Sequence, residues 1–466
     1  MPEQAEKTLR NGIRDDALIR VVSETAVKEH ISIFIVGGWI RDCLLGRHSD
    51  DYDFIVGGDA HSLAEAVARR VGGTSFSMGQ EAPYTYRVVV DGKTLDFVSQ
   101  GIPELTAELA RRDFTVNTLT WSCGDERLFD PFNGLSDLLA KIIRMVSPDV
   151  FHADPLRMLR AVRLAAVLKG FRIDAETEKE IRRHPDALAG SAVERIREEI
   201  DRILLSGRAA DGLEKLRSLG LLFVVFPELK PLSGLAQGPY HHLDALEHTF
   251  KVVASVDGLA GLCGTFSFPF ELGREDRRVL AWSTLLHDLG KKVSSTIDAS
   301  GVPHFYGHEK TGAEIVGAVT TRFSFPKRRA ERIRRLVRYH VRGLGLVKDG
   351  FTDRALRRII ARLEEDLPLH VLLSLADRRA ARGRNFGKME QRTVALGQAL
   401  LDLYAAKGEE VCSPPVLVTG DDVMNLLGVS PGPAIGAILS KIRALQVDGE
   451  IGTREEALAF LRNHLL

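Results

Sequence analysis

The chain has 466 residues, a formal net charge of zero and 44% hydrophobic residues. Several domains are expected, because single hydrophobic cores rarely grow beyond a few hundred residues. The balanced total charge excludes any argument for nucleic-acid binding from net charge alone, so such binding has to come from local patches. Four cysteines lie far apart without a Cys-x-x-Cys pair, which argues against a zinc ribbon or a disulfide framework. The polar N-terminus and the lack of a long apolar run predict a cytoplasmic protein without a membrane span.

Short apolar runs in the N-terminal part predict strands, and helical periodicity dominates the rest. The strand candidates are Ile33–Val36, Asp53–Val56, Tyr86–Val90 and Thr94–Val98. Asp91 and Gly92 between the last two favour a tight hairpin, which implies an antiparallel or mixed sheet. From about Pro148 onward helices are expected, among them Arg157–Lys169 and Ala192–Leu205. The pattern indicates an α+β chain with a small N-terminal sheet and an all-helical remainder.

A glycine turn and two carboxylates form the first chemical motif. In chain order its residues are Gly37, Gly38, Arg41, Asp42, Asp51 and Asp53. Side chains alternate along a strand, so Asp51 and Asp53 point to the same face of theirs. A carboxylate pair beside a glycine turn suits a divalent metal next to a phosphate group. The motif therefore indicates nucleotidyl transfer.

Asp96 and an arginine pair extend this motif. Asp96 lies on a predicted strand and is a candidate third carboxylate for two magnesium ions about 4 Å apart. Arg111 and Arg112 can neutralise a triphosphate, because guanidinium groups bind phosphate oxygens bidentately. Asp113 could orient one of the guanidinium groups. The alternative for an isolated Arg-Arg-Asp run is a solvated charged face.

Two later segments complete the chemistry of the N-terminal part. The segment Asp130–Leu138 predicts a turn leading into a helix, with a structural role beside the site. Asp154 followed by Pro155 is typical of a helix start. Charged residues recur there every three positions and share one helix face: Asp154, Arg157, Arg160 and Arg163. An acid and an arginine together offer the acceptor and donor groups that could read a Watson–Crick edge.

These motifs, in this order and spacing, resemble the class II tRNA nucleotidyltransferase and bacterial poly(A) polymerase family within the DNA polymerase beta superfamily. Residues 30–210 carry the resemblance, including the Arg-Arg-Asp-Phe-Thr motif at Arg111–Thr115. The family usually has Glu-Asp-x-x-Arg as its base-reading motif. This chain keeps Asp154 and Arg157 but has Ala153 at the position of the Glu, so the role of that Glu does not carry over.

The resemblance implies template-independent addition of nucleotides to the 3′ end of tRNA, with release of pyrophosphate. It implies that Asp51 and Asp53 bind the catalytic Mg²⁺, with Asp96 as a third catalytic carboxylate. The residues expected to contact CTP or ATP are Gly37, Gly38, Arg41, Arg111, Arg112, Asp113, Asp154, Arg157, Arg160 and Arg163.

A single connection bears on which nucleotides are added. CCA-adding members of the family have a flexible loop between the third carboxylate strand and the Arg-Arg-Asp motif, and members without it tend to stop after CC. Here only Phe97–Ala110 separates Asp96 from Arg111, and an expected helix at Pro103–Ala110 leaves little room for a mobile loop. The prediction is a CC-adding enzyme, with full CCA addition, A addition and poly(A) synthesis as alternatives.

A second set of metal-binding residue types follows in residues 240–380. In chain order it consists of His248, His287, Asp288, His308, His340 and Asp377. This order resembles HD-domain metal-dependent phosphohydrolases. The first two histidines and both acids would bind one manganese, nickel, iron or zinc ion. His308 and His340 would bind a second metal or a phosphate.

The chemistry implied by the HD resemblance is hydrolysis of phosphomonoesters or cyclic phosphodiesters by a metal-activated water. In a fused tRNA nucleotidyltransferase such a domain could trim or repair 2′,3′-phosphate ends. A degenerate HD fold kept as a scaffold is the alternative. A phosphohydrolase whose head only binds RNA is the rival from another functional class.

Basic segments and the C-terminal tail are the candidate RNA-binding surfaces. Lys327–Arg342 contains eight basic residues and one acid. A second basic cluster consists of Arg378, Arg379, Arg382 and Arg384. Such residues could follow a phosphate backbone or simply form solvated helix faces. In the tail the turn Leu427–Gly436 opens an expected helix at Ala434–Leu445. A similar segment in the family would face the tRNA elbow.

The expected organisation has four parts. They are a nucleotidyltransferase head (1–147), a helical neck with base-reading and RNA-binding roles (148–226), an HD domain (240–380) and a helical tRNA-binding tail (381–466). The Pro- and Gly-rich segment Pro227–Pro239 separates the second and third parts.

Overall fold

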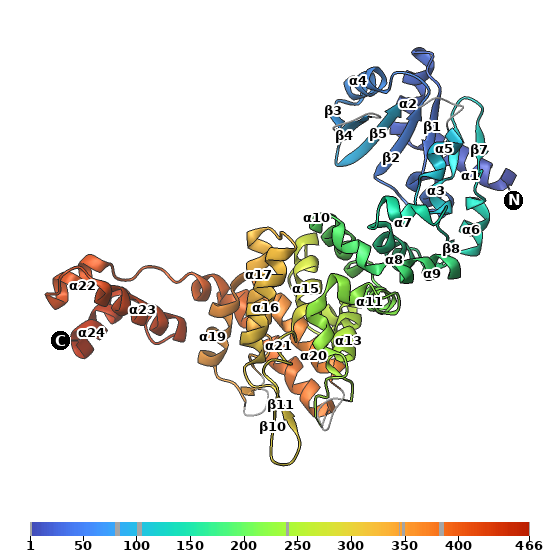
Figure 1. Cartoon of the computed structure of the whole chain (residues 1–466). Coiled ribbons are helices and arrows are strands. Elements are labelled where there is room, and N and C mark those ends of the chain that lie inside the picture. Colours follow the sequence, from blue (N-terminus) through green and yellow to red (C-terminus); the bar gives the residue numbers. More distant parts are fainter. Residues whose placement is uncertain are drawn as a thin grey trace. The chain divides into compact units, whose positions relative to one another are not determined.

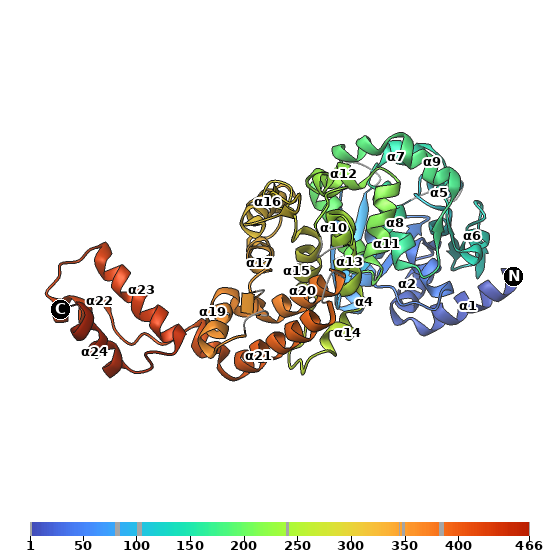
Figure 2. The same cartoon turned by 90° about the horizontal axis from the view of Figure 1, so that it is seen from below.

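The computed structural model describes residues 2–79, 84–99, 105–238, 242–343, 345–346, 350–381 and 386–465. The chain forms two compact units, and Figures 1 and 2 show their elements from two directions. Unit 1 comprises Met1–Ser191 and Ser218–Val224, and unit 2 comprises Ala192–Arg217 and Val225–Leu466. The expected neck is divided between these units, and the four-part boundaries stay a prediction. One mixed sheet followed by helices confirms the α+β fold class.

Unit 1 contains the sheet and the helices that cover it. Its helices are α1 (Pro2–Asp15), α2 (Ala17–Lys28), α3 (Gly38–Leu44), α4 (Ala60–Val71), α5 (Leu105–Ala110), α6 (Gly134–Ala140), α7 (Asp149–Ala153), α8 (Arg157–Val167) and α9 (Ala175–Arg183), with 3₁₀ turns at Thr115–Asn117 and Pro185–Gly190. Its strands are β1 (Ile33–Val36), β2 (Asp51–Val56), β3 (Thr74–Met78), β4 (Thr85–Val90), β5 (Lys93–Ser99), β6 (Thr120–Ser122), β7 (Arg127–Phe129), β8 (Ile142–Ile143) and β9 (Arg172–Ile173).

The main sheet has the strand order β3-β4-β5-β2-β1-β6-β7. All neighbours are antiparallel except β2 and β5, which run parallel. The hairpin between β4 and β5 forms as predicted: Val90 pairs with Lys93, and Asp91 and Gly92 both have positive φ, as a two-residue turn requires. The edge strand β3 was not predicted, although Phe76 and Met78 alternate with two serines there; the strand is short and stays mostly exposed.

The two faces of the sheet are covered by different helices. Tyr52 of β2 donates a hydrogen bond to Asp16, the N-cap of α2, and α4 packs against β3, β4 and β5. On the opposite face, Val36 and Ile55 pack against Leu109 of α5. Side chains alternate along β2, so Asp51 and Asp53 share the face of Ile55. The carboxylate motif therefore lies on the α5 side of the sheet.

Within the described residues, unit 2 is helical apart from one small hairpin, and of the elements that follow only α12 lies in unit 1, except for its last residue. The elements after residue 192 are α10 (Val193–Leu204), α11 (Ala209–Ser218), α12 (Leu222–Val225), α13 (Ala245–Asp257), α14 (Leu259–Cys263), α15 (Arg274–Leu286), α16 (His308–Arg322), α17 (Lys327–Tyr339), α19 (Asp353–Leu363), α20 (Leu367–Ala380), α21 (Phe386–Cys412), α22 (Gly420–Leu427), α23 (Pro433–Asp448) and α24 (Arg454–Leu465), with strands β10 (Thr296–Ile297) and β11 (Pro303–His304) and 3₁₀ turns at Pro227–Leu232 and Glu364–Asp366.

Packing in unit 2 brings distant helices together. The helix α13 packs against α15 and α20, and α17 packs against α15 and α16. The last three helices enclose a small core of their own around Val423, Ile442 and Leu461. The expected tail helix is present as α23, which begins directly after Gly432. Within the described residues, no helix combines the length and the apolar composition that a bilayer crossing requires.

Candidate functional site

Strand register brings the three head carboxylates to one face of the sheet. Asp53 of β2 is the partner of Asp96 on the parallel strand β5, and Asp51 lies two residues before Asp53. Their oxygen atoms still do not converge as a closed cage: these acids do not form a group with three donor atoms within 4.8 Å of one another. A cation at this position would therefore need further ligands from elsewhere.

Basic side chains of the protein already engage two of these acids. The Nη1 atom of Arg112 lies 3.6 Å from Oδ2 of Asp53. Arg87 donates two hydrogen bonds to Asp96, at 2.7 and 2.6 Å, from the neighbouring strand β4. Because both oxygens of Asp96 are held in this way, Asp51 and Asp53 are the carboxylates most open to a cation.

Asp53 has the most perturbed environment of the three. Desolvation by the surrounding protein raises the pKa of Asp53, Arg112 opposes that shift, and the charges of Asp96 and Asp51 add to it. The side chain nevertheless remains 46% exposed, so a solvent-borne ligand can reach it. Negative charge gathered in this way is stabilised by a divalent cation.

The glycine turn closes tightly over the same carboxylate. Gly37 has a φ of +80°, in the region that favours glycine, and precedes α3, which begins at Gly38. A Cβ at Gly37 would lie 2.5 Å from Nη1 of Arg112 and 3.0 Å from Oδ2 of Asp53. No other residue fits here without displacing these two groups.

The basic residues of the two motifs take different positions. Arg41 donates to both oxygens of Asp42 at 3.0 and 2.9 Å and to Oδ1 of Asn117 at 2.7 Å. Of the expected arginine pair, only Arg112 approaches the carboxylates. Arg111 is 76% exposed at its side chain and its nearest acid is Glu108 of α5, at 3.9 Å.

Asp113 joins the arginine motif to the helix α8. It is buried, accepts a hydrogen bond from Nδ2 of Asn117 at 2.8 Å and forms an ion pair with Arg160 at 3.0 Å. Burial alone would raise the pKa of Asp113, but Arg160 and Asn117 outweigh burial and hold the pKa below its ordinary value. The guanidinium that Asp113 orients is therefore on α8 and not on its neighbour Arg112.

The base-reading candidates lie where α7 ends and α8 begins. Asp154 caps the C-terminus of α7 and accepts a hydrogen bond from the Leu156 amide at 3.2 Å. The helix start that Asp154-Pro155 predicts is two residues too early, since α8 begins at Arg157, the first residue of the expected helix Arg157–Lys169. Arg157 donates to the Val150 carbonyl at 3.3 Å, which ties the two helices together. Arg163 follows further along α8 and is partly buried.

The segment Asp130–Leu138 has a structural role, as the sequence indicates. Asp130 accepts hydrogen bonds from the amides of Gly134 and Leu135 at the start of α6. A Cβ at Gly134 would lie 2.2 Å from the Thr115 carbonyl oxygen, so α6 packs directly on the turn after the Arg-Arg-Asp motif. This contact supports the arginine motif from behind.

In unit 2, all six residues of the expected HD set come together. They lie on α13 (His248), directly after α15 (His287, Asp288), at the start of α16 (His308), directly after α17 (His340) and on α20 (Asp377). Donor atoms within 4.8 Å of one another form two groups: His248, His287 and Asp377, and Asp288, His308 and His340.

Asp288 lies between the two groups. Its Oδ2 is 3.0 Å from Nε2 of His287, and its Oδ1 is 3.6 Å from Nε2 of His308 and 3.8 Å from Nε2 of His340. A carboxylate with one oxygen toward each group is suited to bridge two metal ions. This differs from the expected division, in which Asp288 belongs only to the first group.

The histidine hydrogen bonds indicate which ring nitrogen is available. The Nδ1 atoms of His308 and His340 lie 2.7 Å from the carbonyls of Phe305 and Val337, and these contacts make Nδ1 the donor. Burial lowers the pKa of His340 to about 3, so its ring is neutral at pH 7. The two Nε2 atoms then face each other at 3.1 Å with a lone pair toward the shared space. A cation satisfies this arrangement, so the residues present fit a metal centre.

Two residues hold the HD turn in place. Lys291 is buried and its Nζ lies 2.7 Å from Asp288 and 2.5 Å from Oε1 of Gln237. Burial alone would raise the pKa of Asp288, but His287 and Lys291 hold it well below the ordinary value. A Cβ at Gly290 would lie 2.0 Å from the carbonyl oxygen of His308, so the turn packs on the first residue of α16 by backbone contact.

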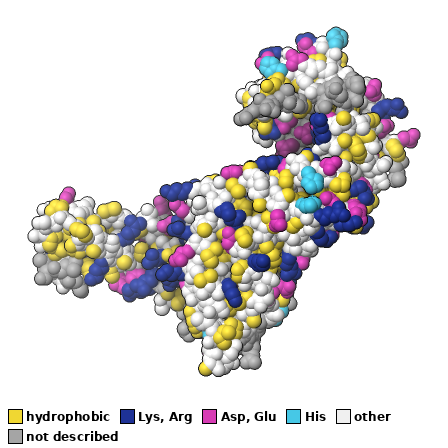
Figure 3. Space-filling model, viewed as in Figure 1, with side chains coloured by type: hydrophobic (Ala, Val, Ile, Leu, Met, Phe, Trp, Pro, Cys, Tyr) yellow, Lys and Arg dark blue, Asp and Glu magenta, His cyan; other side chains and the backbone are white. Residues whose placement is uncertain are grey.

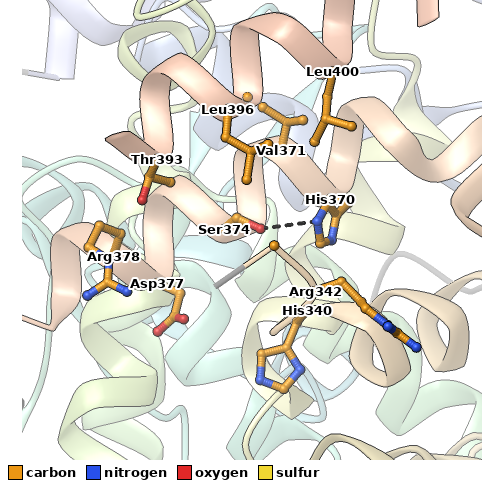
Figure 4. A pocket seen from close by; sticks show the side chains of 12 residues that line it. His340, Arg342, His370, Val371, Ser374, Asp377, Arg378, Thr393, Leu396 and Leu400 are labelled. Atoms are coloured by element: carbon orange, nitrogen blue, oxygen red, sulfur yellow. Dashed lines mark hydrogen bonds between the residues drawn. The ribbon is translucent and has the colours of Figure 1, made fainter. Parts of the chain in front are cut away.

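A pocket opens beside this cluster (Figure 4). His340 and Asp377 belong to both the cluster and the pocket wall. The other side chains shown come from α20, α21 and the end of α17: Arg342, His370, Val371, Ser374, Arg378, Thr393, Leu396 and Leu400. Arginine side chains can bind a phosphate, while the apolar side chains provide a surface for a base or sugar. The pocket therefore offers two arginines and an apolar wall beside the metal-binding residues.

The sequence leaves two explanations for the basic helix α17, a phosphate-binding surface and a solvated face, and the structure adds ion pairing within unit 2. Figure 3 shows that Lys and Arg side chains on the visible face are interspersed with acidic ones. Five arginines of α17 form ion pairs with acids of unit 2: Arg328 with Glu365, Arg329 with Glu275, Arg332 with Asp366, Arg335 with Glu364 and Arg338 with Glu309. In the other cluster Arg379 pairs with Glu390, while Arg382 and Arg384 lie outside the described residues. Much of this positive charge is thus paired with acidic side chains of the same unit.

Three partner residues were missed at the sequence level. Arg87 faces Asp96 because a two-residue turn at Asp91 and Gly92 places them in register. Counting outward from that turn would have found the pair. Lys291 follows Asp288 by three residues within one helical turn, which is also a readable signal. Asn117 lies four residues after its partner Asp113, but its contact with Arg41, 76 residues away, gave no local signal.

Three parts of the chain match known family models. Residues 33–144 match the poly A polymerase head domain, and residues 170–232 match the probable RNA and SrmB-binding site of polymerase A. Residues 245–382 match the HD domain. The matches follow the order of the head, neck and HD parts.

Relatives extend over nearly the whole chain. An A-adding tRNA nucleotidyltransferase of Deinococcus radiodurans is 38% identical over 435 residues, 92% of this chain and 94% of that protein. A CC-adding tRNA nucleotidyltransferase of Thermus thermophilus is 38% identical over 441 residues, 92% of each chain. The Bacillus stearothermophilus CCA-adding enzyme in complex with CTP has a similar fold, with a TM-score of 0.62 and 23% identity over 97% of this chain and 98% of that one.

Proposed function

The chain belongs to the tRNA nucleotidyltransferase family, and we propose that it adds CMP to the 3′ end of tRNA without a nucleic-acid template. The observation that carries this proposal is the register of Asp53 and Asp96 beside the Gly37 turn and Arg112. The two carboxylates, the guanidinium of Arg112 and a turn that accepts no side chain thus lie at one point of the sheet. A cytoplasmic location accords with such a substrate.

The reaction is attack of the terminal ribose 3′-oxygen on the α-phosphorus of the nucleotide, with pyrophosphate as the leaving group. Magnesium, held by Asp51 and Asp53 together with phosphate oxygens of the nucleotide, would activate the hydroxyl and stabilise the developing charge. Arg112 lies within 3.6 Å of Asp53 and is the cation placed to bind the triphosphate. Arg87 keeps Asp96 in position by its paired hydrogen bonds.

Base selection is assigned to the junction of α7 and α8. Asp154 offers a hydrogen-bond acceptor and Arg157 offers donors, which together complement the edge of a cytosine. The hydrogen bond of Arg157 to the Val150 carbonyl fixes its distance from Asp154. Arg160 is held by Asp113, so the helix that presents these residues is anchored to the arginine motif.

The short connection after β5 favours CC addition over full CCA addition. The strand β5 ends at Ser99 and α5 begins at Leu105, so residues 100–104, which lie outside the described residues, are all that separate them. A long flexible loop has no room there. A addition is the second candidate, because the A-adding and CC-adding relatives are equally similar to this chain. Poly(A) synthesis is not favoured by these relatives.

Extension assays distinguish these activities. Three tRNA transcripts that end before CCA, after C and after CC are incubated with CTP, with ATP and with both. A CC-adding enzyme extends the first two to CC with CTP and leaves the third unchanged. Extension of only the third transcript with ATP would identify A addition, and a CCA product from the first would overturn the CC proposal.

We further propose that the HD cluster hydrolyses phosphate esters at nucleic-acid ends. Two groups of donors bridged by Asp288 and a pocket with Arg342 and Arg378 support this. A bound transition metal would supply an activated water for attack on phosphorus. The chain's own candidates for holding that phosphate are Arg342 and Arg378, which line the pocket together with His340.

The test is release of phosphate from 2′-phosphate nucleotides, and opening of 2′,3′-cyclic phosphate nucleotides to phosphomonoesters, with manganese, nickel, iron or zinc. The Asp288→Asn variant serves as the comparison, and its nucleotide incorporation is measured in parallel. If the wild-type protein neither releases phosphate nor opens the cyclic phosphate with any of these metals, the HD fold is a scaffold.

A further inference from the structure

A third group of potential metal ligands lies in unit 1, apart from both sites described above. His152 of α7, Glu180 of α9 and His184 at the end of α9 each offer a donor atom, and these atoms lie within 4.8 Å of one another. The two imidazole rings approach to 5.3 Å between centroids. We propose that these three residues bind a divalent transition metal, such as zinc, which clamps the last turn of α7 onto α9.

The donor set has the chemistry of a zinc site. Two imidazoles and one carboxylate are a common set of three protein ligands for Zn²⁺, with water in the remaining position. Glu180 and His184 are four residues apart, so they project from the same side of α9. The two histidines are exposed while Glu180 is only 8% exposed. An ion can therefore reach the site from solvent and still meet a carboxylate that the protein holds in place.

The present partner of Glu180 can be replaced. Arg183 lies 2.6 Å from Oε2 of Glu180, but its own side chain is 56% exposed. An exposed guanidinium can return to water when an ion takes its place on the carboxylate. A divalent ion held by three ligands outweighs that contact.

The position of the clamp links it to base selection. His152 lies two residues before Asp154, the acid assigned to base reading, and the Asp154 amide closes α7 by donating to the Val150 carbonyl at 3.2 Å. An ion on His152 would hold that turn against α9 and so restrict where Asp154 can lie. Only this consequence rests on the proposed function; metal binding itself does not.

The experiment counts metal ions on the full chain. Zinc binding is measured by equilibrium dialysis for the wild type and for a His287→Ala/His340→Ala variant, which takes one ligand from each of the two HD groups and so disables the HD cluster. We expect the disabled variant to retain one tight equivalent, and its nucleotide incorporation shows that the head is folded. Adding His152→Gln or Glu180→Gln should lower the affinity for this remaining zinc ion at least about 100-fold, more than the loss of a hydrogen-bond partner of a ligand would. His61→Gln, at an exposed histidine elsewhere in unit 1, is the matched control and should change nothing.

Hydrogen exchange supplies a second measurement that does not depend on disabling the HD cluster. Zinc should slow exchange of the amides of residues 150–154 in the wild type and leave them unchanged in the His184→Gln variant. In the otherwise wild-type chain, His184→Gln should also lower the total zinc content by one equivalent. The proposal is overturned if the disabled variant binds no tight zinc, or if its zinc persists unchanged without His152.

Discussion

The head carboxylates and the HD cluster are two ways of building a metal platform in one chain. In the head, the acids lie on adjacent strands, Asp53 is 46% exposed, and arginines take up part of the negative charge. In the HD cluster, five other donor residues surround buried Asp288, and histidine lone pairs face one another.

The two sites therefore differ in the source of their metal ligands, which is the substrate in part at one site and the protein at the other. A pair of acids with few other donors leaves coordination positions that the phosphates of a substrate must fill. A closed set of histidines and acids holds its ion without the substrate. The head is therefore expected to take its metal with the nucleotide, whereas the HD cluster is expected to keep its metal throughout the reaction cycle.

The largest effect is expected when a carboxylate of the head is removed. Asp51→Ala should lower nucleotide incorporation at least about 10³-fold, because the developing charge loses its counter-ion. Phosphate release by the HD cluster should be unchanged in the same preparation. Asp50→Ala, at the exposed neighbouring acid, is the matched control in a primer-extension assay. Retained incorporation by the Asp51 variant would contradict the assignment of the head as the transferase site.

The reciprocal change tests the independence of the HD cluster. Asp288→Asn removes the carboxylate that faces both groups, so metal content should fall and phosphate release should drop about 10²–10³-fold. Metal analysis of the purified protein and a phosphate assay measure these effects. Nucleotide addition to tRNA should continue at the wild-type rate, and a parallel loss would mean that the two activities share a site.

The anchor between the arginine motif and α8 predicts a pH-dependent stability. Asp113→Asn should lower the free energy of unfolding by about 2–3 kcal/mol at pH 7, since Arg160 loses a buried anionic partner. The folded pKa of Asp113 lies below its unfolded value, so its stabilisation is complete above about pH 4 and is lost as the pH falls further. Denaturant unfolding at pH 7 and pH 3 measures the difference between the two proteins. An equal difference in the free energy of unfolding between the two proteins at both pH values would contradict this account.

The smallest effect is expected at Arg87. Arg87→Gln removes both hydrogen bonds to Asp96 and should reduce kcat for CMP addition about tenfold while leaving the affinity for tRNA unchanged. If the two residues act as a unit, an Arg87→Gln/Asp96→Asn double variant should be no worse than the more impaired single variant. Additive losses would show that Asp96 acts independently of Arg87.

Much of the head could be predicted because its information is local. Alternation along β2 gave the shared face of Asp51 and Asp53, and the Asp91-Gly92 turn gave the hairpin. The register that sets Asp53 beside Asp96 is parallel, and no turn joins those strands, so only the folded sheet fixes it. The same holds for the pairing of Asp113 with Arg160, which are 47 residues apart.

The HD set was recognisable from residue order, although its geometry was not. The sequence grouped Asp288 with His248, but the folded helices place one of its oxygens toward His308 and His340. Likewise the arginines of α17 suggested an RNA surface, since their acidic partners such as Glu275 and Glu365 lie more than 30 residues away in the chain. Long-range charge pairing of this kind leaves no trace in a local window.

The backbone contact at Gly290 has a consequence for how unit 2 comes apart. With the HD turn and the first residue of α16 separated by no side chain, the two halves of the histidine cluster cannot loosen one at a time. Release of α16 would remove His308 from the cluster and expose the turn that carries Asp288 in the same event. Metal loss and the melting of this helix are thus expected as one cooperative transition, with a midpoint that shifts with the concentration of free metal.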